Sequence, residues 1–307
     1  MILDFRQCLA THDKIMMEGA LGERLKREYQ LTFDEHVAMA ALIYQKAGRA
    51  ALEALWQQYL AIAQTYQLPF LATTPTRRAN VQRVSQSSYS AAIIADNVRF
   101  LRRIQQKSNT LMFVGGLMGC KGDAYTGADA LSTKDALDFH RWQAELFAQA
   151  EVDFLYAGIM PTLPEAIGMA QALASTHLPY IISFTIAENG CLIDHTPICD
   201  AIAAIDAQTP VPPVCYMTNC IHPRIAQKAL AQPFNDQPAV HERFWGIQAN
   251  TSPLAYAELD GAAELHCSEP LSFAQDIIAL RNACGLKIIG GCCGTDGRHM
   301  TEIAKRL

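Results

Sequence analysis

The chain has 307 residues, half of them hydrophobic and 18% charged, which is enough apolar material for a large buried core. Its formal net charge of −5 and the absence of any basic run exclude nucleic acid and anionic membrane surfaces as expected partners. No apolar stretch is long enough to span a bilayer and residues 1–14 lack the apolar centre of a signal peptide, so we expect a cytoplasmic protein.

Short apolar runs recur along the whole chain and predict eight strands. Most are continuously apolar rather than alternating, which is typical of parallel strands buried on both faces. The predicted strands are Ile15–Glu18, Pro69–Thr74, Thr110–Gly115, Val152–Ala157, Tyr180–Thr185, Val214–Thr218, Phe244–Ala249 and Leu286–Gly291.

Longer amphipathic stretches separate these runs and predict helices. In chain order they are Phe33–Gly48, Arg49–Tyr66, Ser87–Gln106, Thr133–Gln149, Leu163–Ser175, Pro197–Asp206, Pro223–Ala231, Ser272–Cys284 and Gly297–Leu307. Residues 235–241 are polar and predict an exposed excursion.

The alternation of strand and helix predicts a (β/α)8 TIM barrel, an α/β fold, as a single domain over residues 1–307. A doubly wound open sheet is the alternative. That fold would need a glycine-rich phosphate turn, whereas the first strand leads into Glu18-Gly19-Ala20-Leu21-Gly22, so the barrel is favoured.

Three cysteines follow two of the predicted strands. Cys220 comes directly after the sixth strand, and Cys292 and Cys293 come directly after the eighth. The carboxyl ends of barrel strands meet at one rim, where active sites form. Flanking glycines allow both adjacent thiols to turn inward, so we expect all three sulfur atoms to converge.

Three thiols at one rim indicate a zinc site. Zinc prefers thiolate ligands in a tetrahedron, and a catalytic zinc keeps one position open. A substrate thiol in that position would lose its proton and keep enough charge to attack a methyl carbon.

Other interpretations of these cysteines stay open at this stage. The three residues could be ordinary buried cysteines, or two could form a disulfide. A zinc site could also belong to a non-catalytic zinc- or thiol-binding barrel, or to a hydrolase. Three thiolates disfavour the hydrolase, because they make zinc-bound water a poor acid.

Several of these motifs resemble the homocysteine S-methyltransferase family. They are Asn219-Cys220 followed by Pro223, and the string Gly290-Gly291-Cys292-Cys293-Gly294-Thr295. Weaker matches at Glu18–Leu25, Thr73–Thr76 and Asn250–Ser252 extend the likeness over nearly the whole chain. The resemblance implies zinc on Cys220, Cys292 and Cys293, and methyl transfer to homocysteine. The donor it implies is betaine, S-methylmethionine, S-adenosylmethionine or a folate.

The resemblance also implies a set of substrate-binding residues, with two departures. Glu18, Gly19, Thr74, Asn219 and Asn250 fall on matching positions. Where the family has a glutamate after the fourth strand for the amino group of homocysteine, this chain has Gly158. Glu18 replaces the family's shorter aspartate, and we expect it to take over the missing role. The acceptor is therefore homocysteine or a related thiol, while the methyl donor and homo-oligomer formation stay open.

Weaker candidates lie on other predicted loops. Arg77 and Arg78 suit an acidic substrate group, and Asp194, His195 and His222 suit acid–base or supporting roles, although each is also typical of a solvated loop. His266-Cys267 follows no predicted strand, and Gly115–Gly119 predicts rim packing rather than a phosphate loop.

Overall fold

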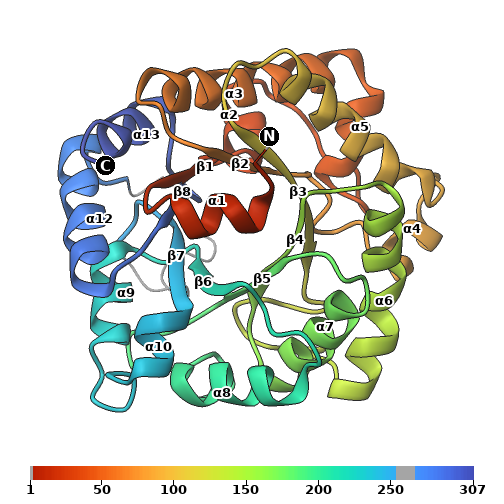
Figure 1. Ribbon diagram of the computed structural model, residues 1–307. Coiled ribbons are helices and arrows are strands. Elements are labelled where there is room, and N and C mark those ends of the chain that lie inside the picture. The colour runs from red at the N-terminus through yellow and green to blue at the C-terminus, as the bar shows by residue number, and fades with distance from the viewer. Residues whose placement is uncertain (1–2, 254–266) are drawn as a thin grey trace.

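Eight parallel strands pair in sequence order and close into a barrel, with helices around the outside (Figure 1). The computed structural model describes residues 3–253 and 267–307. The strands are β1 (Ile15–Met17), β2 (Phe70–Thr73), β3 (Met112–Gly119), β4 (Phe154–Met160), β5 (Tyr180–Phe184), β6 (Cys215–Asn219), β7 (Phe244–Ala249) and β8 (Ile288–Gly291). The predicted (β/α)8 barrel is confirmed.

The strands form where the sequence is continuously apolar, and nearly all of their residues are buried on both faces. Strand β3 runs four residues past its predicted end at Gly115. The glycines that suggested the end of the strand lie within it, and neighbouring side chains pack directly against them. A β-carbon at Gly115 would lie 2.4 Å from the ring of Phe154, and one at Gly116 would lie 2.6 Å from Phe147. The absence of side chains here lets neighbouring aromatic rings approach the strand.

The helices are α1 (Phe5–Thr11), α2 (Gly22–Arg27), α3 (Lys46–Thr65), α4 (Val81–Gln86), α5 (Ala92–Gln106), α6 (Thr133–Gln149), α7 (Leu163–Ala174), α8 (Ile198–Gln208), α9 (Pro223–Leu230), α10 (Pro238–Arg243), α12 (Pro270–Cys284) and α13 (Gly297–Ala304). From residue 133 onward each predicted helix is present with bounds that differ by three residues at most, and α10 is an additional helix that was not predicted. Pro164 and Pro223 lie in first turns, where a missing N–H costs little, as predicted.

Two predicted helices are wrong in part. Phe33–Gly48 is not an α-helix, because Ala38 has a positive φ of 50° and only Met39–Tyr44 winds into a 3-10 turn, η1. Ser87–Gln106 begins later than predicted, at Ala92. The excursion at residues 235–241 contains helix α10, and Asn235 within it is fully buried.

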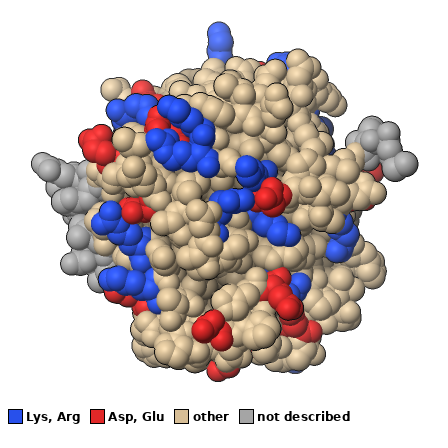
Figure 2. Space-filling model, turned by 60° about the vertical axis from the view of Figure 1, so that its left-hand side comes forward, with Lys and Arg blue, Asp and Glu red and all other residues tan. Residues whose placement is uncertain are grey.

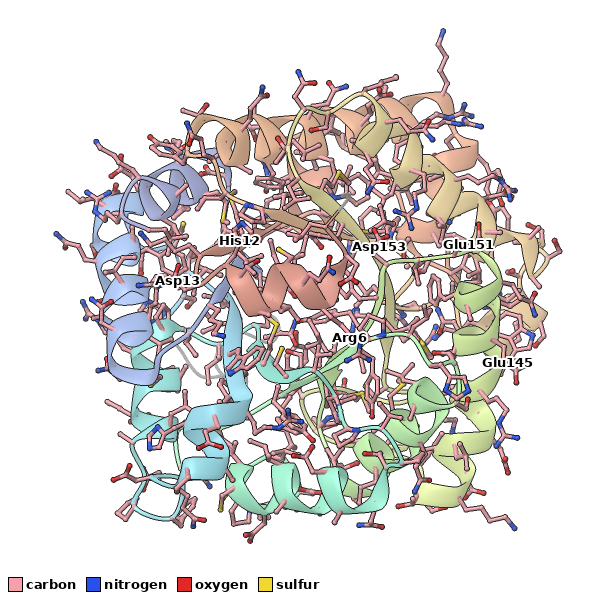
Figure 3. All side chains as sticks on the ribbon, in the orientation of Figure 1. Arg6, His12, Asp13, Glu145, Glu151 and Asp153 are labelled. Carbon is pink, nitrogen blue, oxygen red and sulfur yellow. The ribbon has the colours of Figure 1, made fainter. Side chains whose placement is uncertain are left out.

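Helix α1 covers the N-terminal ends of the strands (Figure 1). The Phe5 ring stacks on Phe154 with centroids 4.4 Å apart and meets Phe113 edge-on at 5.6 Å. Arg6 on this helix and Asp153, next to β4, are labelled in Figure 3. This end of the barrel is therefore closed, and the site must lie at the opposite, C-terminal end.

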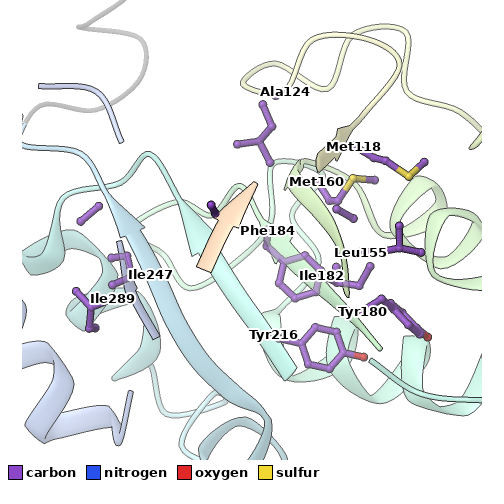
Figure 4. Packing of buried hydrophobic residues seen from close by; sticks show 14 of the residues in the cluster. Met118, Ala124, Leu155, Met160, Tyr180, Ile182, Phe184, Tyr216, Ile247 and Ile289 are labelled. Atoms are coloured by element: carbon purple, nitrogen blue, oxygen red, sulfur yellow. The ribbon is translucent and has the colours of Figure 1, made fainter. Parts of the chain in front are cut away.

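Most of the apolar core lies between the strands and the helices that surround them. Phe184 on β5 and Tyr216 on β6 stack with centroids 5.5 Å apart, beside Tyr180 and Ile182 (Figure 4). The core thus holds the strands rigidly, which fixes the positions of the residues at their carboxyl ends.

Charged side chains are spread over the surface. On the face in Figure 2, Lys and Arg lie in small groups beside Asp and Glu, with wide areas of other residues between them. In the described part of the chain, no helix is long and apolar enough to cross a membrane.

Candidate metal centre

Three cysteine sulfur atoms meet at the C-terminal end of the barrel. Cys220 follows β6, and Cys292 and Cys293 follow β8, on either side of β7. The Cys220 and Cys293 Sγ atoms are 3.6 Å apart, those of Cys292 and Cys293 are 4.0 Å apart, and all three lie within 4.8 Å of one another. Within residues 3–253 and 267–307, this is the one group of three potential ligands placed to hold a metal ion.

The spacing of the sulfur atoms fits a single tetrahedral ion. Zinc–sulfur bonds near 2.3 Å at tetrahedral angles place neighbouring sulfurs about 3.8 Å apart. The three thiols are free, and a disulfide would require a separation of roughly 2 Å. The cluster therefore has the geometry of a three-thiolate zinc site.

The backbone around the thiols is held by the end of β7. The Cys220 amide donates to the Gln248 carbonyl at 2.8 Å, and the Cys292 amide donates to the Ala249 carbonyl at 2.7 Å. Cys220 adopts a left-handed conformation with φ of 57°, which costs roughly 1–3 kcal/mol in a residue other than glycine. Such strain, supported by surrounding structure, is typical of a functional position.

Gly294 allows the Cys292-Cys293 pair to turn inward. Its φ is 81°, and a β-carbon there would lie 1.9 Å from the Thr251 hydroxyl. The Gly294 amide donates to the Glu23 carboxylate at 2.6 Å, and the Thr295 hydroxyl donates to the Cys292 carbonyl at 2.7 Å. These bonds fix the turn that presents both thiols.

The thiols differ in their accessibility and in their affinity for protons. Cys220 is buried, Cys292 is half-buried and Cys293 is exposed. Hydrogen bonding with Cys292 and Cys293 lowers the pKa of the Cys220 thiol, while hydrogen bonding with Cys220 raises the pKa of the Cys292 thiol. Like charges oppose one another in so small a cluster, so a bound cation is needed for all three thiols to ionise together.

The two predicted asparagines lie around the thiols. The Asn250 amide nitrogen is 3.7 Å from Cys220 Sγ. Asn219 crosses the barrel interior, where its Nδ2 donates to the Tyr156 hydroxyl and to Gln248 Oε1, both at 2.8 Å. Its Oδ1 accepts the Ile159 amide at 3.0 Å. Asn219 thus ties the end of β4 to β6.

Glu18 lies after β1 and is 3% exposed. Its carboxylate accepts the Thr73 hydroxyl at 2.5 Å and the Thr73 amide at 3.2 Å. Burial raises the pKa of Glu18 to about 7, although the hydrogen bonds from Thr73 oppose this shift. Burial is the largest cause of the raised pKa of Tyr156, and electrostatic interactions with Glu18 and Cys292 add to it. Glu18, Tyr156 and Cys292 therefore share one interior region.

The remaining predicted residues have contacts within the fold. A β-carbon at Gly19 would lie 2.7 Å from the Tyr59 hydroxyl. The Thr74 hydroxyl shares a hydrogen bond with Thr76 at 2.7 Å and accepts the Leu117 amide at 3.1 Å. Gly158 lies within β4, where a β-carbon would lie 3.1 Å from the Leu117 side chain.

Two tyrosines near the site are missing from the sequence prediction. Tyr125 lies in the loop between β3 and α6, and its side chain hydrogen-bonds to Cys220 and lowers the pKa of that thiol. No motif marks this loop residue. Tyr156 lies two residues before Gly158 on β4, so the period of two along a strand could have placed it on the same interior face.

The weaker candidates from the sequence form hydrogen bonds that hold helix ends and loops in place. His222 is the N-cap of α9 and accepts the Arg224 amide, and Asp194 accepts the amides of Leu163 and Thr196. Cys267 Sγ lies 3.5 Å from Nε2 of His299. His266 lies outside the described residues. The segment Gly115–Gly119 belongs to β3, in agreement with the expected packing role.

Comparison with known proteins identifies the family of this chain. The sequence profile of the family described as homocysteine S-methyltransferase matches residues 15–307. Homocysteine S-methyltransferase YbgG of Bacillus subtilis (strain 168) is 22% identical, with 96% of this chain and 95% of that protein covered. Homocysteine S-methyltransferase of Escherichia coli (strain K12) is 23% identical, with 98% and 97% covered.

Solved structures share the fold. The homocysteine methyltransferase MmuM from Escherichia coli matches in its oxidized form with a TM-score of 0.77 and 20% identity over 97% of this chain and 98% of that one. Its metallated form matches with a TM-score of 0.75 and 20% identity, over 98% and 99%. The profile match over nearly the whole chain means that this protein belongs to the homocysteine S-methyltransferase family and is a thiol S-methyltransferase.

Proposed function

We propose that this protein transfers a methyl group from an onium donor to homocysteine, giving methionine, at a zinc ion held by Cys220, Cys292 and Cys293. The observation that carries the proposal is the sulfur spacing of 3.6 and 4.0 Å at the open end of the barrel, which suits tetrahedral zinc. The metallated form of the structurally similar MmuM adds support for a metal in this fold.

A bound zinc ion would supply the positive charge that favours deprotonation of a thiol at neutral pH. The chain's own residues set up the rest of the reaction. Tyr125 and Asn250 direct polar groups at the Cys220 sulfur, and the exposed Cys293 leaves one side of the cluster accessible. The substrate thiol releases its proton to solvent water, and its sulfur forms a bond to the methyl carbon. The donor's bond to that carbon breaks, and its electron pair stays on the donor.

The interior acid Glu18 is the proposed partner for the amino group of homocysteine. Gly158 offers no carboxylate, and no ion pair holds Glu18 among the residues that the structure describes. An ammonium group would complete a charge-assisted hydrogen bond to this buried carboxylate. Gly19, Thr74, Asn219 and Asn250 are proposed to shape the same pocket.

The proposal is tested by zinc analysis together with a mass-spectrometric assay for thiol methylation. Purified protein should hold about one zinc per chain, and Cys220→Ser, Cys292→Ser and Cys293→Ser should each lose zinc and activity. Cys284→Ser, on helix α12, is the matched control and should retain both. Full zinc in the triple variant would overturn the metal site. Zinc without methylation of any thiol would favour a binding protein instead, and ester or peptide hydrolysis would favour a hydrolase.

A further inference from the structure

A pocket of about 520 Å³ lies between the loops that follow β2 and β3. Four cationic side chains line it: Arg77, Arg78, Arg83 and Lys121. Two carboxylates, Asp123 and Asp129, also line it. The pocket therefore has an excess of positive charge on a protein whose net charge is −5.

The four cations have no carboxylate partner within ion-pair distance among the described residues. The Asp123 carboxylate accepts the amides of Tyr125 and Thr126, at 2.8 and 2.7 Å, and so serves the loop's own turn. Burial and the guanidinium groups of Arg83 and Arg77 lower the pKa of Arg78. Four positive charges thus line the pocket against two negative ones, and this excess of positive charge favours a bound anion.

The fold supports the positions of two of these side chains. The Arg77 stem lies against the end of β3, where a β-carbon at Gly119 would approach its Cγ to 2.7 Å. Arg83, on α4, donates to the His36 carbonyl at 3.4 Å. Guanidinium groups bind the oxygen atoms of carboxylates and phosphates in pairs, so the ligand chemistry that fits is an oxyanion.

The pocket also connects to the thiols through one side chain. Tyr125 lines the pocket and hydrogen-bonds to Cys220. A ligand whose acidic end lies among the arginines could therefore extend to the sulfur cluster. We infer that one of the two substrates carries a multiply charged oxyanionic group, a phosphate or a set of carboxylates, which this pocket binds. The inference rests on the proposed methyl transfer and adds a substrate class to it.

The test uses the zinc-containing protein and two probes, inorganic phosphate and citrate, titrated calorimetrically at low ionic strength. At least one probe should bind saturably, and Arg77→Gln/Arg83→Gln should weaken it by about tenfold or more, because charge-assisted hydrogen bonds are lost. Arg103→Gln, which removes an exposed charge from α5, is the control and should bind like the wild type. If the double variant fails to fold, Arg78→Gln replaces it, since this exposed side chain has no hydrogen bond to the described residues.

The possible outcomes distinguish a failure of the acidic-substrate inference from a failure of the proposed methyl transfer. Equal affinity in all variants, or no binding of either probe, would overturn the acidic-substrate inference even if zinc and methylation are normal. Anion binding with the expected losses, but without zinc or methylation, would instead overturn the proposed function. In the active enzyme, the probe that binds should inhibit competitively against the substrate that carries the acidic group, which assigns the pocket to donor or acceptor.

Discussion

Glu18 is a carboxyl group that the barrel encloses, and it forms no ion pair with the residues that the structure describes. Its ionised form has lost hydration, and the two donors from Thr73 only partly replace the water. The pKa of about 7 means that protonated and ionised forms are both present at neutral pH. A substrate ammonium group would shift this balance toward the carboxylate.

The role of Glu18 in specificity predicts a selective kinetic defect. Glu18→Gln should raise the KM for homocysteine by roughly 10- to 100-fold, as expected for a lost charge-assisted bond, with a much smaller effect on a thiol that lacks the amino group. Gly158→Glu should favour homocysteine, because Leu117, 3.1 Å from the new β-carbon, is a flexible side chain that can move. Gly158→Gln is its uncharged control. The same ratio of kcat/KM for the two thiols in every protein would contradict this account.

Burial of Glu18 also predicts how stability depends on pH. The folded protein binds this proton more tightly than the unfolded chain, since the pKa rises from 4.5 to about 7. The folded state therefore loses stability as pH rises from 4.5 to 7, by a total of about 3 kcal/mol. Glu18→Gln should remove that slope. Urea unfolding of zinc-free wild type and variant across this range measures it, and parallel pH curves would count against the buried, proton-binding state.

The convergence of the three cysteines could be predicted from the sequence, because each of them follows a predicted strand and the strands of a barrel end at one rim. Cys220, Cys292 and Cys293 directly follow runs whose hydrophobicity already indicates buried strands. The role of Tyr125 could not be predicted, since its position depends on the path of the loop between β3 and α6, and a loop has no periodic sequence pattern. The pairing of Glu18 with Thr73 likewise depends on the neighbouring ends of β1 and β2.

Helix α1 was absent from the sequence prediction, yet its apolar face closes the barrel. Phe5, Cys8 and Leu9 are buried, but a helix of seven residues gives too short a pattern to recognise. The predicted helix at Phe33–Gly48 fails for a related reason. Its apolar residues pack against the core in a 3-10 turn after a residue with positive φ. Helix α6, whose Ser132 N-cap accepts the Asp135 amide, was predicted to the residue. The other long helices were predicted with shifted ends.

The packing of α1 predicts a loss of stability that leaves the metal site intact. Phe5→Ala removes a 2%-exposed ring from its stack on Phe154 and should lower the free energy of unfolding by roughly 3–5 kcal/mol. Arg6→Ala, at the neighbouring exposed position, should change it by less than about 0.5 kcal/mol. Zinc content should be normal in both, since α1 lies at the end opposite the thiols. A Phe5→Ala protein as stable as wild type would show that α1 contributes little to the barrel.

At the scale of the molecule, the cysteines join two strands that have β7 between them. An ion bound to Cys220 and to the Cys292-Cys293 pair would link β6 and β8 across the rim. A ligand that binds only the folded state stabilises it in proportion to its free concentration and affinity.

Removal of zinc should therefore lower the melting temperature. We expect a chelator to lower the Tm of the wild type by about 5 °C or more. The Cys220→Ser protein should have the same lowered Tm without chelator, and addition of the chelator should not change it. Scanning calorimetry with and without chelator measures both. A chelator response that is equal in the two proteins would place the stabilising metal elsewhere.

Tyr125 belongs both to the basic pocket and to the surroundings of Cys220. An anion that displaces or orders this side chain would change the affinity of the thiols for metal. Thermodynamic reciprocity then requires the metal to change the affinity for that anion by the same factor. The metal content of the protein and the supply of its acidic ligand would thus be coupled variables, so the level of each would set how readily the protein takes up the other.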